Sequence, residues 1–210
     1  MTASPLPRTS GVLLAAGAGT RLGRGPKALL PFRGRTLVEV LADVLLDGGC
    51  RDVVVVLGAG AADVRARTDL ARHTVVENPE WAGGMGSSFQ AGLDRARPED
   101  HVLVALVDQP GLTAEIVARL LRAHRPGRVA AAAYADDSGK LRRGHPLVLD
   151  ATLRAGAAAS AAGDAGARFF LQAHPELIDL VDCTPPPGSG QSGGEDLDTP
   201  EQLHLLGYFS

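Results

Sequence analysis

The sequence predicts an α/β protein in which helices cover both faces of a mostly parallel central sheet, giving three layers. Short, continuous apolar runs alternate along the chain with segments whose apolar residues recur at helical spacing. Continuous apolar runs are typical of strands that are buried on both faces, as in parallel sheets. The composition agrees, since 45% of the 210 residues are hydrophobic but only 4% are aromatic, so Ala, Val and Leu must form the core.

The chain is expected to form a single domain over residues 11–210, because a chain of 210 residues fits one large core. Residues 1–10 are polar and contain proline, and we expect them to form a flexible arm. The first buried strand is predicted over residues 12–16, where the apolar run ends in a glycine-rich turn.

The first helix is predicted to follow Thr36, because apolar residues recur at i, i+3, i+4, i+7 and i+8 from Leu37. Thr36 and Glu39 have the spacing of a capping box. The later elements continue the alternation, and Ser87 and Gln90 are expected to cap one of the helices. Further strands are predicted over 53–57, 74–77, 101–107, 128–134 and 146–149. Further helices are predicted over 61–71, 88–96 and 116–121, and after Thr199 near the C-terminal end.

Charge and cysteine content exclude several classes of function. The chain has 21 basic and 24 acidic residues and a net charge of −3, whereas a nucleic-acid-binding surface normally shows a basic excess. Cys50 and Cys183 lie far apart and form no CxxC pattern, as in proteins of a reducing compartment. No apolar run approaches the ~18 residues that a membrane span requires. We therefore expect a cytoplasmic protein that binds neither nucleic acid nor a membrane.

The glycine-rich segment after the first strand gives the clearest functional signal. Gly17 and Gly19 let backbone N–H groups approach phosphate oxygens, and Arg21 and Lys27 supply positive charge. The segment departs from the dinucleotide fingerprint G-x-G-x-x-G, because Leu22 stands at the third glycine and no helix opens there. It also lacks the G-K-[ST] of a Walker A loop. A long basic loop around a polyphosphate is favoured over a plain flexible turn.

Two acidic segments are candidates for binding Mg²⁺. Asp108 directly follows an apolar strand and so lies at the carboxyl edge of the sheet, where such folds bind ligands. Asp196 and Asp198 have the period-2 spacing that places two side chains on one face of an extended segment. Mg²⁺ typically takes one or two carboxylates together with substrate phosphates. Each segment taken alone also fits an ordinary turn or helix cap.

Polar groups also occur near a predicted helix start and in two predicted turns. Asn78 follows a strand, and Ser87 and Ser88 lie where free N–H groups bind anions or accept ordinary caps. His145 lies in a predicted turn at a strand start, and Arg168 ends a turn of small residues. A lone histidine is as often structural as functional.

The segment 184–194 is rich in Pro, Gly and Ser. It is expected to form a flexible loop, either a plain linker or a lid over the site.

Together these segments resemble the molybdenum cofactor cytidylyltransferases, which belong to the wider molybdopterin nucleotidyltransferase (NTP transferase) family. The resemblance covers residues 11–206, and its six motifs stand in the family's order. They are Leu14-Ala15-Ala16-Gly17 with Arg21 and Lys27, Asn78-Pro79 with Gly84-Met85-Gly86-Ser87-Ser88, Asp108-Gln109-Pro110, Gly144-His145-Pro146, Gly163-Asp164-Ala165-Gly166-Ala167-Arg168, and Asp196-Leu197-Asp198-Thr199-Pro200. The chain departs from the family in having three residues, 24–26, before Lys27 where two are usual, which bears on the reach of that lysine.

The resemblance implies a Rossmann-like nucleotidyltransferase domain with Mg²⁺ as cofactor. The reaction would move CMP from CTP to the terminal phosphate of a molybdopterin-type cofactor and release pyrophosphate. Guanylyl members usually carry Gly at the position of Ala16, which favours CTP. A molybdoenzyme or its maturation factor is an implied partner.

The resemblance also implies roles for individual residues. Asp108 and Asp198 would hold the metal, and Lys27 and Arg21 would stabilise charge on the α-phosphate and on the departing pyrophosphate. The nucleotide would be bound by Leu14, Ala15, Ala16, Gly17, Ala18, Gly19, Thr20, Asn78, Ser87 and Ser88. The pterin side would be bound by Gly144, His145 and Arg168.

Three alternatives stay open from the sequence. Guanylyl or other NTP transfer to a different phosphorylated acceptor is one, since Gly-Thr-Arg-Leu at 19–22 also occurs in sugar nucleotidyltransferases. A dinucleotide-dependent oxidoreductase would use the glycine loop to hold a cofactor. A non-catalytic carrier would bind the pterin cofactor and deliver it to an apo-enzyme.

Overall fold

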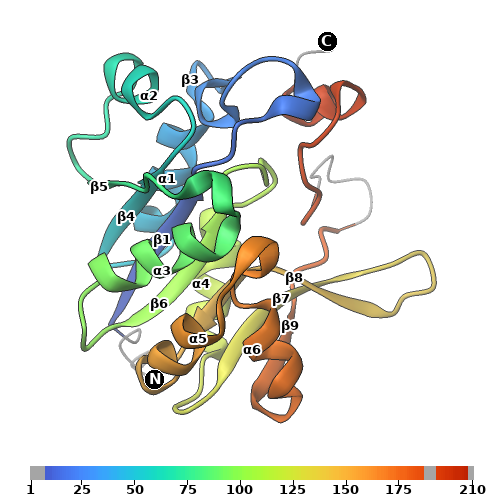
Figure 1. The fold of residues 1–210 in the computed structure, drawn as a ribbon. Coiled ribbons are helices and arrows are strands. Elements are labelled where there is room, and N and C mark those ends of the chain that lie inside the picture. Colours follow the sequence, from blue (N-terminus) through green and yellow to red (C-terminus); the bar gives the residue numbers. More distant parts are fainter. Residues whose placement is uncertain (1–7, 187–192, 208–210) are drawn as a thin grey trace.

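A computed structural model describes residues 8–186 and 193–207 of the chain, in which seven strands form one sheet in the order β5-β4-β1-β6-β8-β7-β9 (Figure 1). These strands are β1 (Thr9–Ala15), β4 (Asp52–Leu57), β5 (Thr74–Glu77), β6 (His101–Leu106), β7 (Val129–Ala135), β8 (Leu141–Leu149) and β9 (Ile178–Asp182). A separate small hairpin pairs β2 (Pro31–Phe32) with β3 (Arg35–Thr36). Only β8 runs antiparallel to its neighbours, so the sheet is mostly parallel, as predicted.

Helices cover both faces of this sheet, which confirms the predicted three layers. The helices are α1 (Leu37–Asp47), α2 (Ala61–Arg67), α3 (Met85–Arg95), α4 (Ala114–Ala123), α5 (Arg154–Ser160) and α6 (Arg168–Ala173). One face packs against α1 and α4, and the other against α3, α5 and α6. Neighbouring residues of β1 divide between the two cores, with Leu13 in the first and Val12 in the second, because successive side chains of a strand point to opposite faces.

Some predicted boundaries are correct and others are wrong. Strand β5 has the predicted bounds, and the capping box of Thr36 and Glu39 begins α1. Strand β1 begins at Thr9, so the expected arm over 1–10 ends earlier; residues 1–7 lie outside the described part of the chain. Helix α2 ends at Arg67 rather than 71, because Thr68 is extended and its hydroxyl donates to the Val64 carbonyl at 2.7 Å.

The predicted start of α3 is also wrong. The helix begins at Met85, with Gly84 as its N-cap. Ser87 lies inside the first turn, and its hydroxyl donates to the Glu80 carbonyl at 3.0 Å instead of capping. Gln90 donates to carbonyls of the 158–161 segment and so joins α3 to α5.

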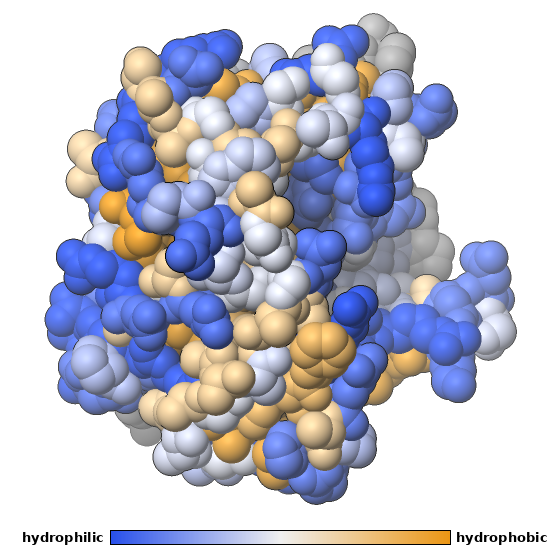
Figure 2. All heavy atoms as spheres, viewed as in Figure 1, coloured by the Kyte–Doolittle hydropathy of each residue, from blue (hydrophilic) through white to orange (hydrophobic). Residues whose placement is uncertain are grey.

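Strand β8 is longer than predicted, because it starts at Leu141 rather than 146. Gly144 and His145 therefore lie within a strand and not in a turn. The end of the β7–β8 hairpin projects from the body of the molecule, and its surface is largely hydrophilic (Figures 1 and 2). A projecting hairpin buries few side chains, so its sequence carries no apolar alternation from which the strand could be predicted.

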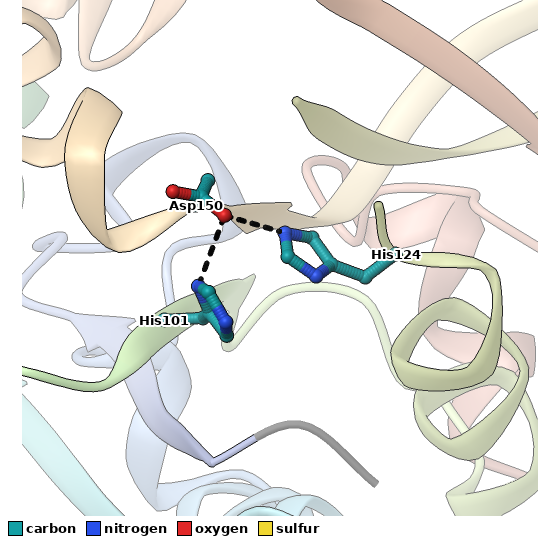
Figure 3. Close-up of side chains that lie close together, drawn as sticks. All are labelled: His101, His124 and Asp150. Atoms are coloured by element: carbon teal, nitrogen blue, oxygen red, sulfur yellow. Dashed lines mark ion pairs between the residues drawn. The ribbon is translucent and has the colours of Figure 1, made fainter. Parts of the chain in front are cut away.

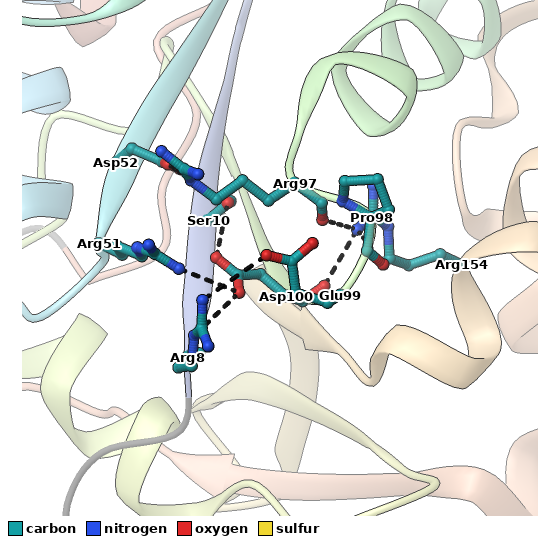
Figure 4. A network of polar contacts seen from close by, with 9 residues as sticks. All are labelled: Arg8, Ser10, Arg51, Asp52, Arg97, Pro98, Glu99, Asp100 and Arg154. Carbon is teal, nitrogen blue, oxygen red and sulfur yellow. Dashed lines mark hydrogen bonds and ion pairs between the residues drawn. The ribbon is translucent and has the colours of Figure 1, made fainter.

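A polar network fastens the amino end of the sheet (Figure 4). The Asp100 side chain is fully buried, accepts from Ser10 Oγ at 3.4 Å and lies 3.5 Å from Arg8 Nε. The Arg154 guanidinium donates to the Asp100 and Pro98 carbonyls at 3.0 and 3.2 Å. These contacts tie the starts of β1, β6 and α5 together, so the opposite, carboxyl edge is left for ligand binding.

The order of the strands places the candidate site. The chain runs from β1 outward to β4 and β5 and then returns to β6 on the other side of β1. The crevice between the carboxyl ends of β1 and β6 is thus a topological switch point, where open α/β sheets bind ligands. In the described residues no helix is long and apolar enough to cross a bilayer.

Candidate active site

A cavity of about 440 Å³ opens at the carboxyl ends of β1 and β6. Its floor comes from the strand ends, one wall from the glycine loop over residues 16–21, and the opposite wall from residues 81–88 around the start of α3. The predicted residues that line it are Leu14, Ala16, Gly17, Ala18, Gly19, Thr20, Arg21, Lys27, Ser88, Asp108 and Asp198.

The glycine loop has a fixed path. Gly19 has φ +62°, and a Cβ atom there would lie 2.4 Å from the Gly25 carbonyl oxygen, so only glycine fits without strain. A short 3-10 turn over Thr20–Leu22 follows. Leu22 is 3% exposed and packs in the core, which explains why a leucine stands where a dinucleotide fingerprint has its third glycine. Arg21 is exposed at the rim, where its charge faces solvent and the cavity.

Lys27 lies between the two candidate metal ligands. Its Nζ is 3.0 Å from Asp108 Oδ2 and 2.6 Å from Asp198 Oδ1, and its side chain is 12% exposed. Burial disfavours the charged ammonium, but the two carboxylates outweigh this and raise the pKa of Lys27 above its ordinary value. Lys27 is therefore a fixed cation at neutral pH, and the extra residue before it does not keep it from the carboxylates.

Asp198 reaches Asp108 across 90 positions of sequence through a backbone contact. The Leu197 N–H donates to the Asp108 carbonyl at 2.7 Å, and the Leu197 side chain is fully buried in the core. Asp196, on the other side of Leu197, accepts from Gln109 Nε2 at 2.8 Å. Asp196 is thus occupied by a structural partner, and of the two acidic residues Asp198 is the one that lines the cavity.

The carboxylates fit a divalent cation. Asp108 Oδ1 is buried and has no hydrogen-bond partner among the described residues. Leaving such an oxygen unsatisfied is costly, whereas a cation that coordinates it would remove the cost. The Lys27 ammonium lies between Asp108 and Asp198 and binds both, which shows that the electrostatic potential there favours positive charge. Two carboxylates facing an open cavity are the oxygen ligands that Mg²⁺ or Mn²⁺ takes alongside phosphates.

Asn78 and Ser87 support the site from behind instead of lining it. The Asn78 amide donates to Ser87 Oγ and to Ser88 Oγ, both at 2.9 Å, and its own oxygen accepts from the Glu80 N–H. Asn78 thus holds the start of α3, and of these polar residues Ser88 is the one in the cavity wall.

Four other predicted residues lie outside the cavity wall. Ala15 points into the core at 2% exposure, because it alternates with Leu14 along β1. Gly144 packs against Tyr134. His145 is half-buried, and the desolvation of its imidazole lowers its pKa to about 4 against the opposing pull of Asp108. Arg168 is exposed and contacts the Phe169 ring.

The cavity wall also contains residues to which the sequence assigned no individual role. Trp81 and Ala82 belong to no predicted motif, whereas Gly84, Met85, Leu106, Val107 and Asp164 lie in or beside predicted motifs. Gly84 has φ +111°, and a Cβ atom there would lie 2.4 Å from the Gly163 carbonyl carbon. The two small-residue segments therefore touch, which brings Asp164 to the cavity. The chain's one tryptophan, within a glycine-rich stretch after a strand end, was a signal that went unused.

Comparisons with known proteins agree with this geometry. The model of the MobA-like NTP transferase domain matches residues 11–177. Nicotine blue oxidoreductase of Paenarthrobacter nicotinovorans is 57% identical over 203 residues, covering 96% of this chain and 97% of that protein.

Solved structures share the fold. Rv0371c of Mycobacterium tuberculosis is 26% identical with a TM-score of 0.76, over 96% of this chain and 98% of that one. Its complex with manganese, 25% identical, has a TM-score of 0.73 over 96% and 100% of the two chains. The nucleotidyl transferase Mth528 of Methanothermobacter, 20% identical, has a TM-score of 0.78 over 96% and 97%, which shows the shared fold. By family match and by fold, the chain belongs to the MobA-like NTP transferase domain family and is a nucleotidyltransferase enzyme.

Proposed function

We propose that the chain transfers CMP from CTP to the terminal phosphate of a molybdopterin-type cofactor and releases pyrophosphate. One observation carries the proposal: Lys27, Asp108 and Asp198 meet at the mouth of a glycine loop in one cavity. A nucleotidyl transfer needs a phosphate cradle, a fixed cation and a pair of metal-binding carboxylates, and this cavity offers all three.

The proposed reaction requires little proton transfer from the protein. The attacking group is a phosphate monoester, whose second pKa of about 6 leaves it mostly ionised at neutral pH. The barrier lies in bringing this anion against a triphosphate. Lys27, held as a cation by two carboxylates, and Arg21 at the rim would offset that charge.

Asp108 and Asp198 are the residues that would hold Mg²⁺. Asp108 Oδ1 is buried and has no partner in the part of the chain that the structure describes, so a metal would coordinate this oxygen first. When bound, Mg²⁺ supplies Lewis-acid charge neutralisation of the phosphates. Lys27 would then be freed from part of its contact with the carboxylates and turn toward phosphate oxygens.

The nucleotide would lie along residues 16–20, with the base toward Ala16 and Trp81. Ala16 is 7% exposed and lines the cavity, so its methyl group narrows the space for a base. This supports CTP over the larger guanine nucleotide, as the family resemblance implies. His145 and Arg168 stay predictions for the pterin side, since neither lines the cavity.

The test is pyrophosphate release from purified protein with Mg²⁺, molybdopterin and each of the four NTPs. We expect release with CTP that requires both Mg²⁺ and the acceptor and falls about 10²–10³-fold in Asp108→Asn. Ala16→Gly should raise the rate with GTP relative to CTP. Equal release with another NTP and a sugar phosphate would move the assignment to a different transfer.

A second candidate is a dinucleotide-dependent oxidoreductase. It is favoured by the relative at 57% identity over nearly the whole of both chains, whose name is nicotine blue oxidoreductase. The glycine loop would hold the pyrophosphate of the dinucleotide. The substrate would contact the apolar wall of the cavity, which is formed by Leu106, Val107, Trp81 and Met85.

One pair of measurements separates the two candidates. Transfer chemistry predicts that CTP with Mg²⁺ stabilises the protein against heat, that NADPH does not, and that Asp108→Asn abolishes the stabilisation. Reduction predicts stabilisation by NADPH without metal and oxidation of NADPH by nicotine blue, largely retained in Asp108→Asn. A single-turnover assay with pterin and CTP also distinguishes an enzyme from a carrier, which would bind pterin without releasing pyrophosphate.

A further inference from the structure

A second cluster of metal-ligating side chains lies at the opposite edge of the sheet. His101 is the first residue of β6, His124 directly follows α4, and Asp150 directly follows β8. Figure 3 shows the three side chains pointing toward one another from three separate elements. Asp108, by contrast, lies just past the far end of β6, so this cluster takes no part in the function proposed above.

The distances suit coordination better than hydrogen bonding. Asp150 Oδ2 lies 3.4 Å from His101 Nδ1 and 3.4 Å from His124 Nε2. A typical N–H···O bond is about 2.7–3.2 Å long. Two ligands of a tetrahedral zinc ion with bonds of ~2.0–2.1 Å are about 3.4 Å apart. The three ligand atoms all lie within 4.8 Å of one another, so a small shift brings them onto one ion.

The facing atoms carry lone pairs and not protons. Ala151 N–H donates to His101 Nδ1 at 3.0 Å, so that nitrogen is unprotonated. His124 has a hydrogen bond with the Arg128 backbone, and its Nε2 has no partner among the described residues. Asp150 Oδ1 accepts from the Thr152 N–H and hydroxyl, and the Asp150 carboxylate also accepts from the Gly127 backbone. Its Oδ2 is the third acceptor that faces the two imidazoles. The three facing atoms are therefore all acceptors, and among the described residues His124 Nε2 has no hydrogen-bond donor. A cation between them would be attracted by all three.

Burial makes this arrangement costly as it stands. The His124 side chain is 2% exposed and that of Asp150 is 4% exposed. Because both side chains are almost fully removed from water, each polar atom there needs a close partner. Neutral imidazole is the form that binds a metal, and a second ring nitrogen bonded to backbone is the usual support of a metal-binding histidine.

We propose that His101, His124 and Asp150 bind a zinc ion that joins β6, α4 and β8. Two imidazoles and one carboxylate are a zinc-type donor set and differ from the all-oxygen set of the candidate active site. His101 is 24% exposed, so the site has access to solvent for ion entry and for a water molecule as fourth ligand. On binding the ion, His101 Nδ1 would give up the hydrogen bond that it accepts from the Ala151 N–H and coordinate the metal instead.

The test uses the full chain with the active-site carboxylate replaced, Asp108→Asn, so that zinc bound there is not counted. Chelator-treated protein is titrated with ZnCl₂ and bound metal is measured after equilibrium dialysis. Cobalt(II) is added in parallel, because a tetrahedral site gives it a strong visible absorption. His124→Gln and His101→Gln remove one ligand each, and His174→Gln is the matched control, since that side chain is 45% exposed outside the cluster.

We expect one zinc ion per chain, at least ~100-fold weaker binding in either ligand variant, and unchanged binding in His174→Gln. Zinc should also raise the melting temperature of the parent but not of the ligand variants. If one ligand variant fails to fold, the other is judged on the same titration. The proposal would be overturned if the Asp108→Asn parent bound no stoichiometric zinc, or if a folded ligand variant bound zinc as tightly as the parent. Neither result bears on nucleotidyl transfer.

Discussion

Replacing Lys27 by methionine tests the electrostatic arrangement of the candidate active site. The substitution keeps an unbranched side chain that is only one atom shorter, and it removes the charge that separates Asp108 from Asp198. In the parent protein the ammonium is 3.0 Å from one carboxylate and 2.6 Å from the other. In the variant these two carboxylates face each other without a cation.

The expected loss of stability depends on how far each of the two carboxylates is exposed to solvent. At about 3 Å and an effective dielectric constant of about 20, one charge pair gives roughly 5 kcal/mol before desolvation is subtracted. The net value of a charged hydrogen bond is about 1.5–3 kcal/mol, which suits Asp108 at 24% exposure. Asp198 is 42% exposed, so its pair contributes only about 0–1 kcal/mol. We therefore expect a loss of about 2–3 kcal/mol, or roughly 4–12 °C in melting temperature for a chain of this size.

Magnesium should reverse part of this loss. Because the variant offers two unpaired carboxylates, Mg²⁺ should bind it more tightly and raise its melting temperature more than it raises that of the parent. Pyrophosphate release should nevertheless fall about 10²–10³-fold, because the fixed cation is gone. The chain's other lysine, Lys140, is exposed on the projecting hairpin, and Lys140→Met is the matched control.

The measurements are thermal melts of both variants and the parent with and without Mg²⁺, together with the pyrophosphate assay. If Lys27→Met melts with the parent and Mg²⁺ stabilises the two equally, Lys27 does not hold the carboxylates apart. Retained turnover would remove Lys27 from the catalytic group.

Three further outcomes follow from the structure. Burial lowers the pKa of His145 from 6.5 to about 4, so between these pH values the unfolded chain binds a proton that the folded chain does not. The free energy of unfolding should therefore fall by about 3 kcal/mol from pH 6.5 down to 4. The fall should be less steep in His145→Gln. Gly84→Ala should lower the melting temperature and weaken nucleotide binding by at least ~10-fold, because the added Cβ meets the Gly163 backbone at 2.4 Å at a positive φ. Trp81 lines the cavity and is the one tryptophan of the chain, so bound nucleotide should change its fluorescence, a signal absent from Trp81→Phe.

The architecture could be predicted because strands buried on both faces appear in the sequence as continuous apolar runs. The runs that became β1, β4 and β6 are continuous and apolar, and Asp108 could be placed at the carboxyl edge simply by its position after such a run. The β8 extension escaped prediction because Arg142 and Arg143 lie on a hairpin that projects from the core, where hydropathy carries no periodic signal.

The site was only partly predictable for a related reason. Period-2 spacing marked Asp196 and Asp198 equally, and only the buried Leu197 and the Gln109 contact decide which of them reaches the cavity. Serine is a common helix N-cap, but the Ser87 hydroxyl accepts a hydrogen bond from the Asn78 side chain and does not cap the helix. Likewise, Trp81 reaches the wall through a close approach to Gly58, which no local pattern encodes.

The measurement that tests the proposed function most directly is pyrophosphate release by the purified chain with CTP, Mg²⁺ and molybdopterin, run beside NADPH oxidation with nicotine blue. We predict release that depends on all three components and is lost in Asp108→Asn, with no NADPH oxidation above background. NADPH oxidation that survives Asp108→Asn, with no pyrophosphate from any NTP, would contradict the proposal and assign the cavity to reduction.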